Sequence, residues 1–475
     1  MPSLTEPSLP STGQWRTGQW RTGQWRTRQW RARPSLLAIA VLALGLSSAA
    51  PAQSLLALYD AARGYDAAYQ SARAQAESLV FKAEQSRALK RATVNGTASW
   101  AESRSETPYS TTTVTRLSQQ NFAVTAQQSL FNRGNDSLIA QADKAIAVAR
   151  SQLAAIEQDL IVRLAQAYFD VLAASDALGT LQTSKRAIAE QLASAKRNFE
   201  VGTATITDTR EAQAKFDLAT AQELAAENDL NVKRLALEGV VGRSGVNPKA
   251  MALPIVLPGI GAADVEEWVS QADQLSPALT QLRLAREVAK LETERARTGN
   301  LPTVAISGSL NDAQTRLSGR TPGGSFGPSS GNGVSANVAV QLTLPLYTGQ
   351  SVQNRIKETL ALEDKAQSDL DAARRSVAQG TRSAFFGLRS LRAQVGALEA
   401  AESSSKLALE ATQLGYKVGV RVNLDVLNAQ TQLYQAQRDL AKARYDVVVN
   451  SLKLRQVSGQ LQPQDVNAVD ALLAR

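Results

Sequence analysis

The sequence FEVGTATITD at residues 199–208 returns 217 residues later in a related form, YKVGVRVNLD, at residues 416–425. A turn built on Val-Gly and followed at a fixed distance by Asp is hard to obtain twice by chance. The same offset aligns further residues without a gap: Phe169 with Phe386, Asp229 with Asp446, and Gly242 with Gly459. Self-similarity at one fixed spacing indicates that the chain is a tandem duplication.

Long helical patterns flank both turns. Residues 137–200 contain no Pro and a single Gly, Gly179. Nine apolar residues recur at spacings of three or four: Leu153, Ile156, Leu160, Leu164, Ala167, Val171, Ala174, Leu178 and Leu181. The eight spacings cover 28 residues, a mean of 3.5 residues, which is the repeat of a coiled-coil seam. Residues 351–417 are predicted to form the matching long helix of the second copy. After each turn a second helix runs back along the first, and these two helices are predicted to end near Gly242 and Gly459. The sequence predicts two long antiparallel helical hairpins.

Ahead of each helical hairpin, the sequence alternates between apolar and polar residues with a period of two. Apolar and mostly polar residues alternate at 94–101 and 122–130 in the first copy, and at 304–310 and 334–346 in the second. Each segment is predicted to be a strand with one apolar face. We expect polar or glycine-rich loops at 103–120 and 311–333 to join the strands of each pair.

The four strands fit a membrane barrel around water, because such barrels require polar-in and apolar-out alternation. Each strand taken singly also fits a half-buried strand of a soluble sheet. Four strands cannot close a barrel, and open edges are not tolerated in lipid. Several chains must therefore share one barrel, with eight strands from two chains or twelve from three.

Residues 1–52 are predicted to lie outside the mature fold. They repeat TGQWR around Trp15, Trp20 and Trp25, with a variant at Trp30, and carry a charge of +5 (six Arg minus Glu6) out of the total of +9. An apolar run and small residues ending at Ala52 follow, which is the layout of a secretory signal. The basic arm could bind nucleic acid, but repeated DNA or a misplaced start is the commoner origin, so we expect no nucleic-acid partner.

The composition excludes several classes of enzyme. With no His and no Cys, the chain has no imidazole base, thiolate, disulfide or ordinary zinc site. No P-loop motif is present, and Gly259-Ile260-Gly261 lacks the third glycine of a dinucleotide-binding loop. We therefore expect no enzymatic activity, cofactor or metal. After the signal no stretch approaches a membrane-spanning helix, so a membrane location must come from strands.

The expected fold is mainly α with a small β part. Residues 53–242 form the first repeat, 243–263 a Pro-rich linker and 264–475 the second repeat with a C-terminal tail. Each repeat is expected to contain a helix, two strands and a long helical hairpin.

Residues 199–208 and 415–427, together with Ala167-Tyr168-Phe169 and Leu344-Pro345-Leu346-Tyr347, closely resemble the TolC family of outer-membrane efflux and type I secretion channels. The resemblance extends from about residue 54 to residue 473. It implies a homotrimer with one twelve-stranded barrel in outer-membrane lipid, continued by a twelve-helix tunnel through the periplasm. It also implies a periplasmic adaptor protein and an inner-membrane ABC or proton-driven transporter as partners.

In this family the periplasmic entrance opens like an iris, and links between the two helical hairpins hold it closed. Tyr416 and Arg421 occupy the positions of the family's linking Tyr and Arg, and Thr207 and Asp208 occupy the positions of their partners. Arg can hold a carboxylate through two parallel hydrogen bonds. Arg421 as a solvated turn residue is the alternative.

Two acidic rings one helical turn apart line the family's constriction. Asp425 matches the first ring, whereas Asn428 stands at the second, which implies weaker cation binding here. Asp208 and Asp425 also suit the first turn of a helix, where the helix dipole favours a carboxylate. Gly202 and Gly419 are expected to serve the geometry of the turns. Helix packing is the expected role of Tyr168, Phe169, Phe385 and Phe386.

The leading functional prediction is a passive export channel that conducts small molecules, proteins or both. An exported periplasmic coiled-coil structural protein is the alternative, but it leaves the four amphipathic strands without a role. A hydrolase that uses only Asp, Glu, Ser or Lys has no motif to support it. The sequence does not choose between drugs and secreted proteins as cargo.

Overall fold

The structure of the chain is a computed structural model that describes residues 53–107, 113–252, 255, 257–259, 261, 264–321 and 323–473. The predicted basic repeat and secretory signal, residues 1–52, lie outside this range. No helix in the described ranges combines the length and the apolar composition needed to cross a membrane.

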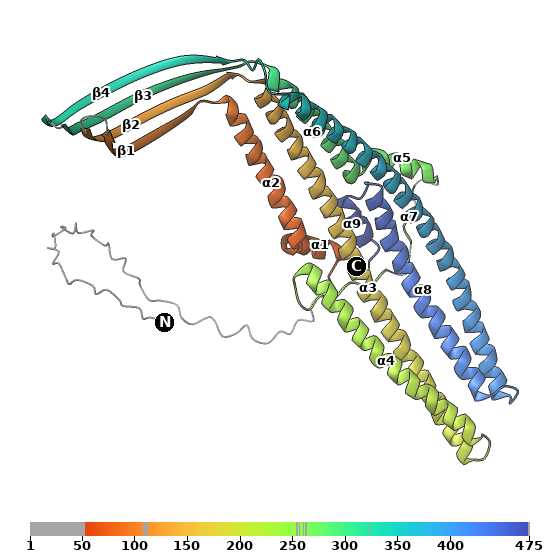
Figure 1. Ribbon diagram of the computed structural model, residues 1–475. Helices are drawn as coiled ribbons and strands as arrows, with labels where there is room; N and C mark the ends of the chain where they lie inside the picture. The colour runs from red at the N-terminus through yellow and green to blue at the C-terminus, as the bar shows by residue number, and fades with distance from the viewer. Residues whose placement is uncertain are drawn as a thin grey trace, which may run out of the picture. The chain divides into compact units, whose positions relative to one another are not determined.

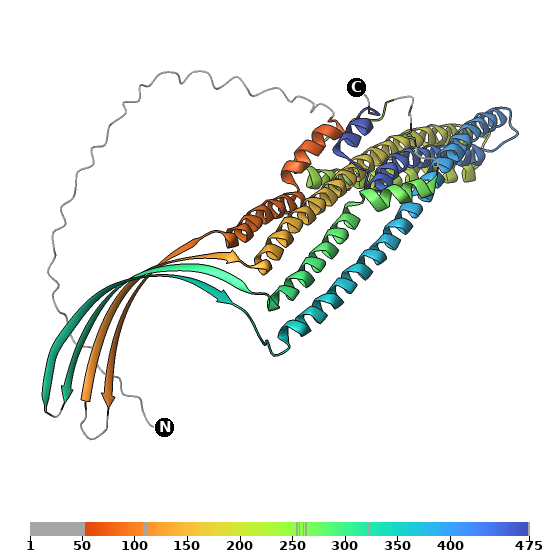
Figure 2. The ribbon, with the colours of Figure 1, turned by 90° about the horizontal axis from the view of Figure 1, so that it is seen from above.

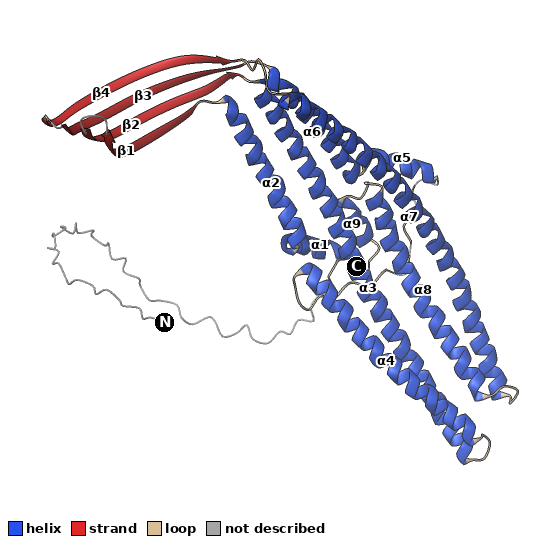
Figure 3. Ribbon diagram, in the orientation of Figure 1, coloured by secondary structure: helices blue, strands red, loops and turns tan. Residues whose placement is uncertain are grey.

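The two copies have the same order of elements (Figures 1 and 3). The first copy contains helices α1 (Leu55–Tyr65) and α2 (Ala67–Arg87), η1 (Ala88–Lys90), strands β1 (Thr93–Thr107) and β2 (Thr113–Phe131), and helices α3 (Arg133–Glu200) and α4 (Ile206–Val241). The second contains α5 (Val265–Leu275), α6 (Pro277–Arg297), η2 (Thr298–Asn300), β3 (Thr303–Thr321), β4 (Gly324–Thr343), α7 (Ser351–Lys417) and α8 (Asn423–Val457), followed by α9 (Pro463–Asp470).

The long helices begin and end close to the predicted residues. Helix α7 has the predicted bounds, whereas α3 begins four residues before Ser137, at Arg133. Asn132 explains the earlier start, because its side chain accepts a hydrogen bond from the backbone N–H of Asn135 and caps the helix. Helix α4 ends at Val241 and is capped by Gly242, whose φ of 74° is the left-handed conformation that glycine adopts readily.

The predicted seam of α3 lies in the main core. Leu160, Leu164, Val171 and Ala174 are buried, and the cluster around them includes residues of α1, α4, α8 and α9. Tyr168 and Phe169 belong to the same cluster, and the ring of Phe169 stacks on Tyr445 of α8 with centroids 5.7 Å apart.

The aromatic pair of the second copy is divided between core and surface. Phe385 is buried in a second cluster on α7 and α8, which confirms its predicted packing role. Phe386 is 53% exposed, but the edge of one ring meets the face of the other in this pair, with the centroids of Phe385 and Phe386 5.6 Å apart.

The four strands form one antiparallel sheet in the order β1-β2-β3-β4, in which pairing of β2 with β3 joins the two copies. The register confirms the predicted alternation, because rows across the sheet are of one kind. One row contains Val94, Ala126, Gly308 and Val338, and the adjacent row contains Asn95, Thr125, Ser309 and Asn337. Among the described residues, β1 and β4 each leave one edge unpaired.

The expected loops at 103–120 and 311–333 are wrong. Strand β1 continues to Thr107, and β3 continues to Thr321, where β4 begins three residues later at Gly324. Antiparallel strands are joined by backbone hydrogen bonds, which do not depend on the side chains. The alternating apolar residues of each strand fix the register, and the same pairing then continues through the Ser-, Thr- and Gly-rich part of the strand. Composition alone made these segments look like loops.

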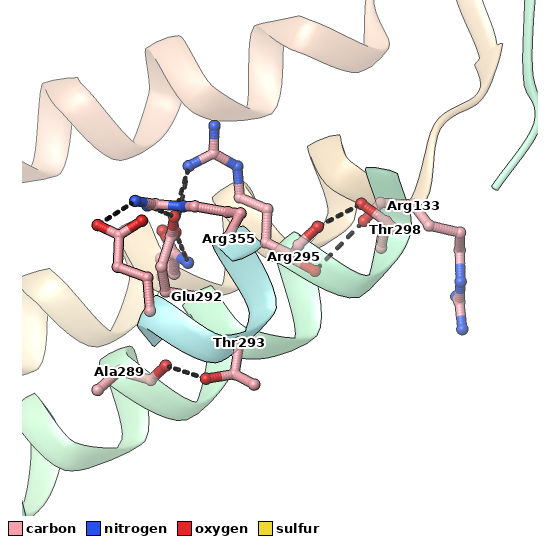
Figure 4. A network of polar contacts seen from close by, with 10 residues as sticks. Arg133, Ala289, Glu292, Thr293, Arg295, Thr298 and Arg355 are labelled. Carbon is pink, nitrogen blue, oxygen red and sulfur yellow. Dashed lines mark hydrogen bonds and ion pairs between the residues drawn. The ribbon is translucent and has the colours of Figure 1, made fainter. Parts of the chain in front are cut away.

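A network of polar contacts joins α3, α6 and α7 (Figure 4). The carboxylate of Glu292 accepts hydrogen bonds from Gln141 at 2.8 Å, Arg355 at 2.6 Å and Arg295 at 3.1 Å. Burial acts to raise the pKa of Glu292, but these three hydrogen bonds outweigh it and hold the pKa below its usual value. Glu292 is therefore ionised at neutral pH and links the three helices close to the base of the sheet.

Candidate functional site

The two hairpin turns lie at the ends of the helices far from the sheet (Figure 1). Their backbones have the same hydrogen bonds: the N–H of Thr203 donates to the carbonyl of Asn198 at 2.8 Å, and the N–H of Val420 donates to that of Gly415 at 2.9 Å. Gly202 and Gly419 have φ values of 77° and 81°. Both glycines thus allow the left-handed backbone that reverses the chain.

The first turn uses its acid as a helix cap. Asp208 accepts hydrogen bonds from the backbone N–H of Thr205 at 2.9 Å and from its hydroxyl at 2.7 Å. The N–H of Asp208 donates in return to the Thr205 hydroxyl at 3.2 Å, which completes a capping box at the start of α4. Thr207 is exposed on the same helical turn.

The second turn has lost this cap. Val422 stands where the first copy has Thr205, and it has no hydroxyl to bond the helix. The carboxylate of Asp425 instead forms an ion pair with Arg421 at 3.6 Å. Both side chains are substantially exposed, 61% for Arg421 and 38% for Asp425, so this pair contributes only about 0–1 kcal/mol.

Tyr416 connects the two hairpins. Its hydroxyl accepts a hydrogen bond from the side-chain amide of Asn198 at 3.2 Å, which links the end of α7 to the end of α3. Asn198 was absent from the predicted site. Its position one residue before Phe199, which the duplication aligns with Tyr416, was the available signal.

A cleft of about 410 Å³ separates the ends of the hairpins. Asp208, Tyr416 and Arg421 line it, with Asn198, Lys417 and Asn423 beside them. Three of the four predicted latch residues therefore share one cleft. Within the described residues, however, the side-chain partners of Tyr416 and Arg421 are Asn198 and Asp425, and not Thr207 or Asp208.

Asp425 and Asn428 lie on one side of α8. Val426 and Leu427 are fully buried on its other side, where Leu427 packs against residues of α3 and α4. Asn428 is exposed and Asp425 is partly exposed, so both face away from the packing within the chain.

The ends of the hairpins contain buried polar atoms without partners. Within the described chain these include both side-chain amide atoms of Asn423 and the amide oxygens of Gln191 and Gln430. A buried polar group of this kind costs about 1–3 kcal/mol where neither water nor another chain reaches it.

Sequence comparison identifies the family. Residues 52–243 and 268–460 match the family described as "Outer membrane efflux protein". The chain belongs to the outer membrane efflux protein family. One relative, "Outer membrane protein TolC" of Vibrio cholerae serotype O1, is 34% identical over 435 residues, which cover 90% of this chain and 96% of the relative. "Alkaline protease secretion protein AprF" of Pseudomonas aeruginosa is 31% identical, over 66% of this chain and 64% of its own.

Solved structures share the fold of this outer membrane efflux protein. The open state of the Neisseria gonorrhoeae MtrE outer membrane channel has a TM-score of 0.70 at 20% identity, covering 86% of this chain and 89% of its own. The Vibrio cholerae outer membrane protein VceC has a TM-score of 0.68 at 17% identity, covering 85% and 96%.

Membership decides between the functions that the sequence left open. The chain is a TolC-type outer-membrane efflux channel protein that extends into the periplasm, and it has no enzymatic role. The alternative of a periplasmic coiled-coil structural protein is not supported. The helices thus belong to a periplasmic tunnel and the strands to its β-barrel part.

Proposed function

We propose that three copies of this chain form one passive channel, fed through a periplasmic adaptor by an inner-membrane ABC or proton-driven transporter. The observation that carries this proposal is the four-stranded sheet, whose outer strands β1 and β4 have unpaired edges in the described residues. Open edges are not stable in lipid. Three sheets joined edge to edge provide twelve strands, and the channel needs an energised partner because the sequence has no nucleotide-binding loop.

The exposed apolar face of the sheet supports the same arrangement. Val334, Val338, Val340 and Leu342 on β4 are all at least 65% exposed, as is Trp100 on β1. The adjacent rows are polar, for example Asn95, Thr125, Ser309 and Asn337. A barrel needs this division, with apolar side chains toward lipid and polar ones toward a water-filled interior.

The names of the relatives support two kinds of cargo. AprF and "Proteases secretion protein PrtF" of Dickeya chrysanthemi are named for protease secretion, and "Outer membrane efflux protein BepC" of Brucella suis is named for efflux. We propose that this channel serves either traffic, with selection made by the transporter. The two repeats, 53–242 and 264–475, are proposed to supply one barrel hairpin and one tunnel hairpin each.

The periplasmic entrance is proposed to be closed by the hairpin ends. Tyr416, Arg421, Thr207 and Asp208 would act as its latch, because three of them line the cleft between the hairpins. The weak pair of Arg421 with Asp425 leaves its guanidinium free to exchange to a carboxylate such as Asp208, of the same or a neighbouring copy.

Membrane fractionation tests the proposal. We expect the protein in outer-membrane fractions, with unheated samples migrating in SDS as a species of three chains and heated samples as monomer. Native mass spectrometry of the detergent-extracted protein should give three copies. A soluble monomer, or an assembly with another number of copies, would refute the trimeric channel.

Asp425 is proposed to form a ring of three carboxylates facing the lumen, next to three Asn428 amides. Asp425→Ala should therefore reduce block of single-channel current by divalent cations, because the main source of negative charge at the constriction is removed. Asp446→Ala, which removes a carboxylate paired with Lys442 elsewhere on α8, is the control. Unchanged block in the Asp425 variant would show that this side chain does not face the lumen.

A further inference from the structure

The apolar face of the sheet ends in a cluster of arginines. Along β1, β2 and β3, the row of Trp100, Gln120 and Gln314 is followed by three rows that contain charged residues on the same face: Arg104, Arg116, Arg316, Arg320, Glu102 and Glu106. The opposite face of these rows has only uncharged residues among those described, such as Ser103, Thr115 and Thr315. The charge therefore lies on the lipid side and not on the lumen side.

The four arginines are close neighbours. Arg104 lies directly opposite Arg116 in the register, and Arg316 and Arg320 flank Ser318, the partner of Arg116 on β3. Diagonal positions of this kind are about 7–8 Å apart. Like charges so placed repel each other, so an anion held between them would relieve the repulsion.

Two of the four arginines have no carboxylate partner among the described residues. Arg104 pairs with Glu106 at 2.5 Å and Arg116 with Glu102 at 3.5 Å. Arg316 and Arg320 have exposed side chains, and within the described part of the chain neither pairs with a carboxylate. Asp312, two residues before Gln314, is the other acid on this face. The four arginines outnumber the three acids, and the excess charge centres on Arg316 and Arg320.

The position of the cluster matches the boundary of a membrane. From Val304 to Gln314 the face extends ten residues, about 33 Å along the strand, and a tilt of about 40° reduces this to the roughly 25 Å height of a barrel's apolar band. The arginine rows come next, toward the ends of the strands that lie far from the helices (Figure 2). Because the helices are periplasmic, this side of the band is the outer leaflet.

We propose that Arg104, Arg116, Arg316 and Arg320 form a binding site for the phosphate groups of phosphorylated lipids in the outer leaflet. The inference rests on the proposed barrel. Guanidinium groups bind phosphate through paired hydrogen bonds, and several on one face can hold a lipid that bears two phosphates. The bound lipid would fix the depth of the barrel in the membrane and would cover the pairing of β1, β2 and β3.

The test compares lipid binding to intact trimers. Native mass spectrometry in detergent with EDTA, titrating diphosphorylated lipid A, should show saturable binding to the wild-type protein. The variant Arg316→Gln with Arg320→Gln keeps the ion pairs of Glu102 and Glu106 intact. It should bind diphosphorylated lipid A about tenfold more weakly, because charge-assisted hydrogen bonds to phosphate are lost. Monophosphorylated lipid A should bind more weakly than the diphosphorylated form. Inorganic phosphate should compete only at far higher concentration.

The control carries the same charge change at the other end of the sheet. Arg91→Gln with Arg133→Gln alters residues that adjoin β1 and β2 near the helices, and should bind diphosphorylated lipid A like the wild type. Equal affinity of the wild type and the Arg316/Arg320 variant would overturn the proposal, as would an equal loss in the control. Trimer mass and channel conductance should be unchanged in every variant, so a failure of the channel proposal is recognised separately.

Discussion

Tyr416→Phe combined with Arg421→Ser should raise single-channel conductance in planar bilayers severalfold. The first change removes the hydrogen bond from Asn198 that joins the two hairpins, worth about 1 kcal/mol, and the second removes the guanidinium proposed to exchange to Asp208. Over three copies the loss of the Asn198 hydrogen bond alone amounts to about 3 kcal/mol, enough to shift a closed entrance toward its open form.

Two further variants separate the contributions. Asn198→Ala should reproduce the part of the increase that depends on Tyr416, because it removes the donor of the same hydrogen bond. Arg210→Ser removes an exposed guanidinium from α4 near the same end and should leave conductance unchanged. If the double variant conducts like the wild type, these residues do not form the latch.

Val338→Arg should abolish the heat-resistant trimer. Val338 is 77% exposed on the apolar face of β4. An arginine on the lipid face near the bilayer midplane costs about 2–4 kcal/mol in each copy, so a trimer would lose about 6–12 kcal/mol. Unheated samples in SDS should contain monomer, and less protein should reach the outer-membrane fraction.

The adjacent residue provides a matched control. Asn337 lies on the opposite face of β4, in the row of Ser309 and Thr125. Asn337→Arg adds the same side chain to the water-filled interior and should preserve the trimer. If both arginines are tolerated equally, or if Asn337→Arg is the more damaging change, the assignment of the two faces is wrong.

The periodic parts of the fold were predictable because their pattern is local. The seam from Leu153 to Leu181 has the apolar spacing of a long helix and lies within α3, and α7 has the bounds predicted from the repeat. The duplication extended these conclusions to the second copy. The same local logic failed at residues 103–120 and 311–333, because Ser- and Gly-rich sequence has no period to reveal a strand.

The candidate site was predicted in place but not in its contacts. The resemblance located Tyr416, Arg421 and Asp208, and the structure brings these three to one cleft. The partners differ because they depend on the packing of two hairpins more than two hundred residues apart. Asn198 reaches Tyr416 only in that packing, and Asp208 is occupied by the cap that Thr205 provides.

The duplication, the helical hairpins, the glycine turns and the two faces of each strand follow from the amino-acid sequence. These properties depend on residue spacing and on backbone conformations that neighbouring residues specify. The three-dimensional fold was needed to show that β2 pairs with β3, which side chains meet between the hairpin ends, and that four arginines from three strands lie together on one face. Those outcomes depend on register and packing between distant segments, and no local pattern encodes them.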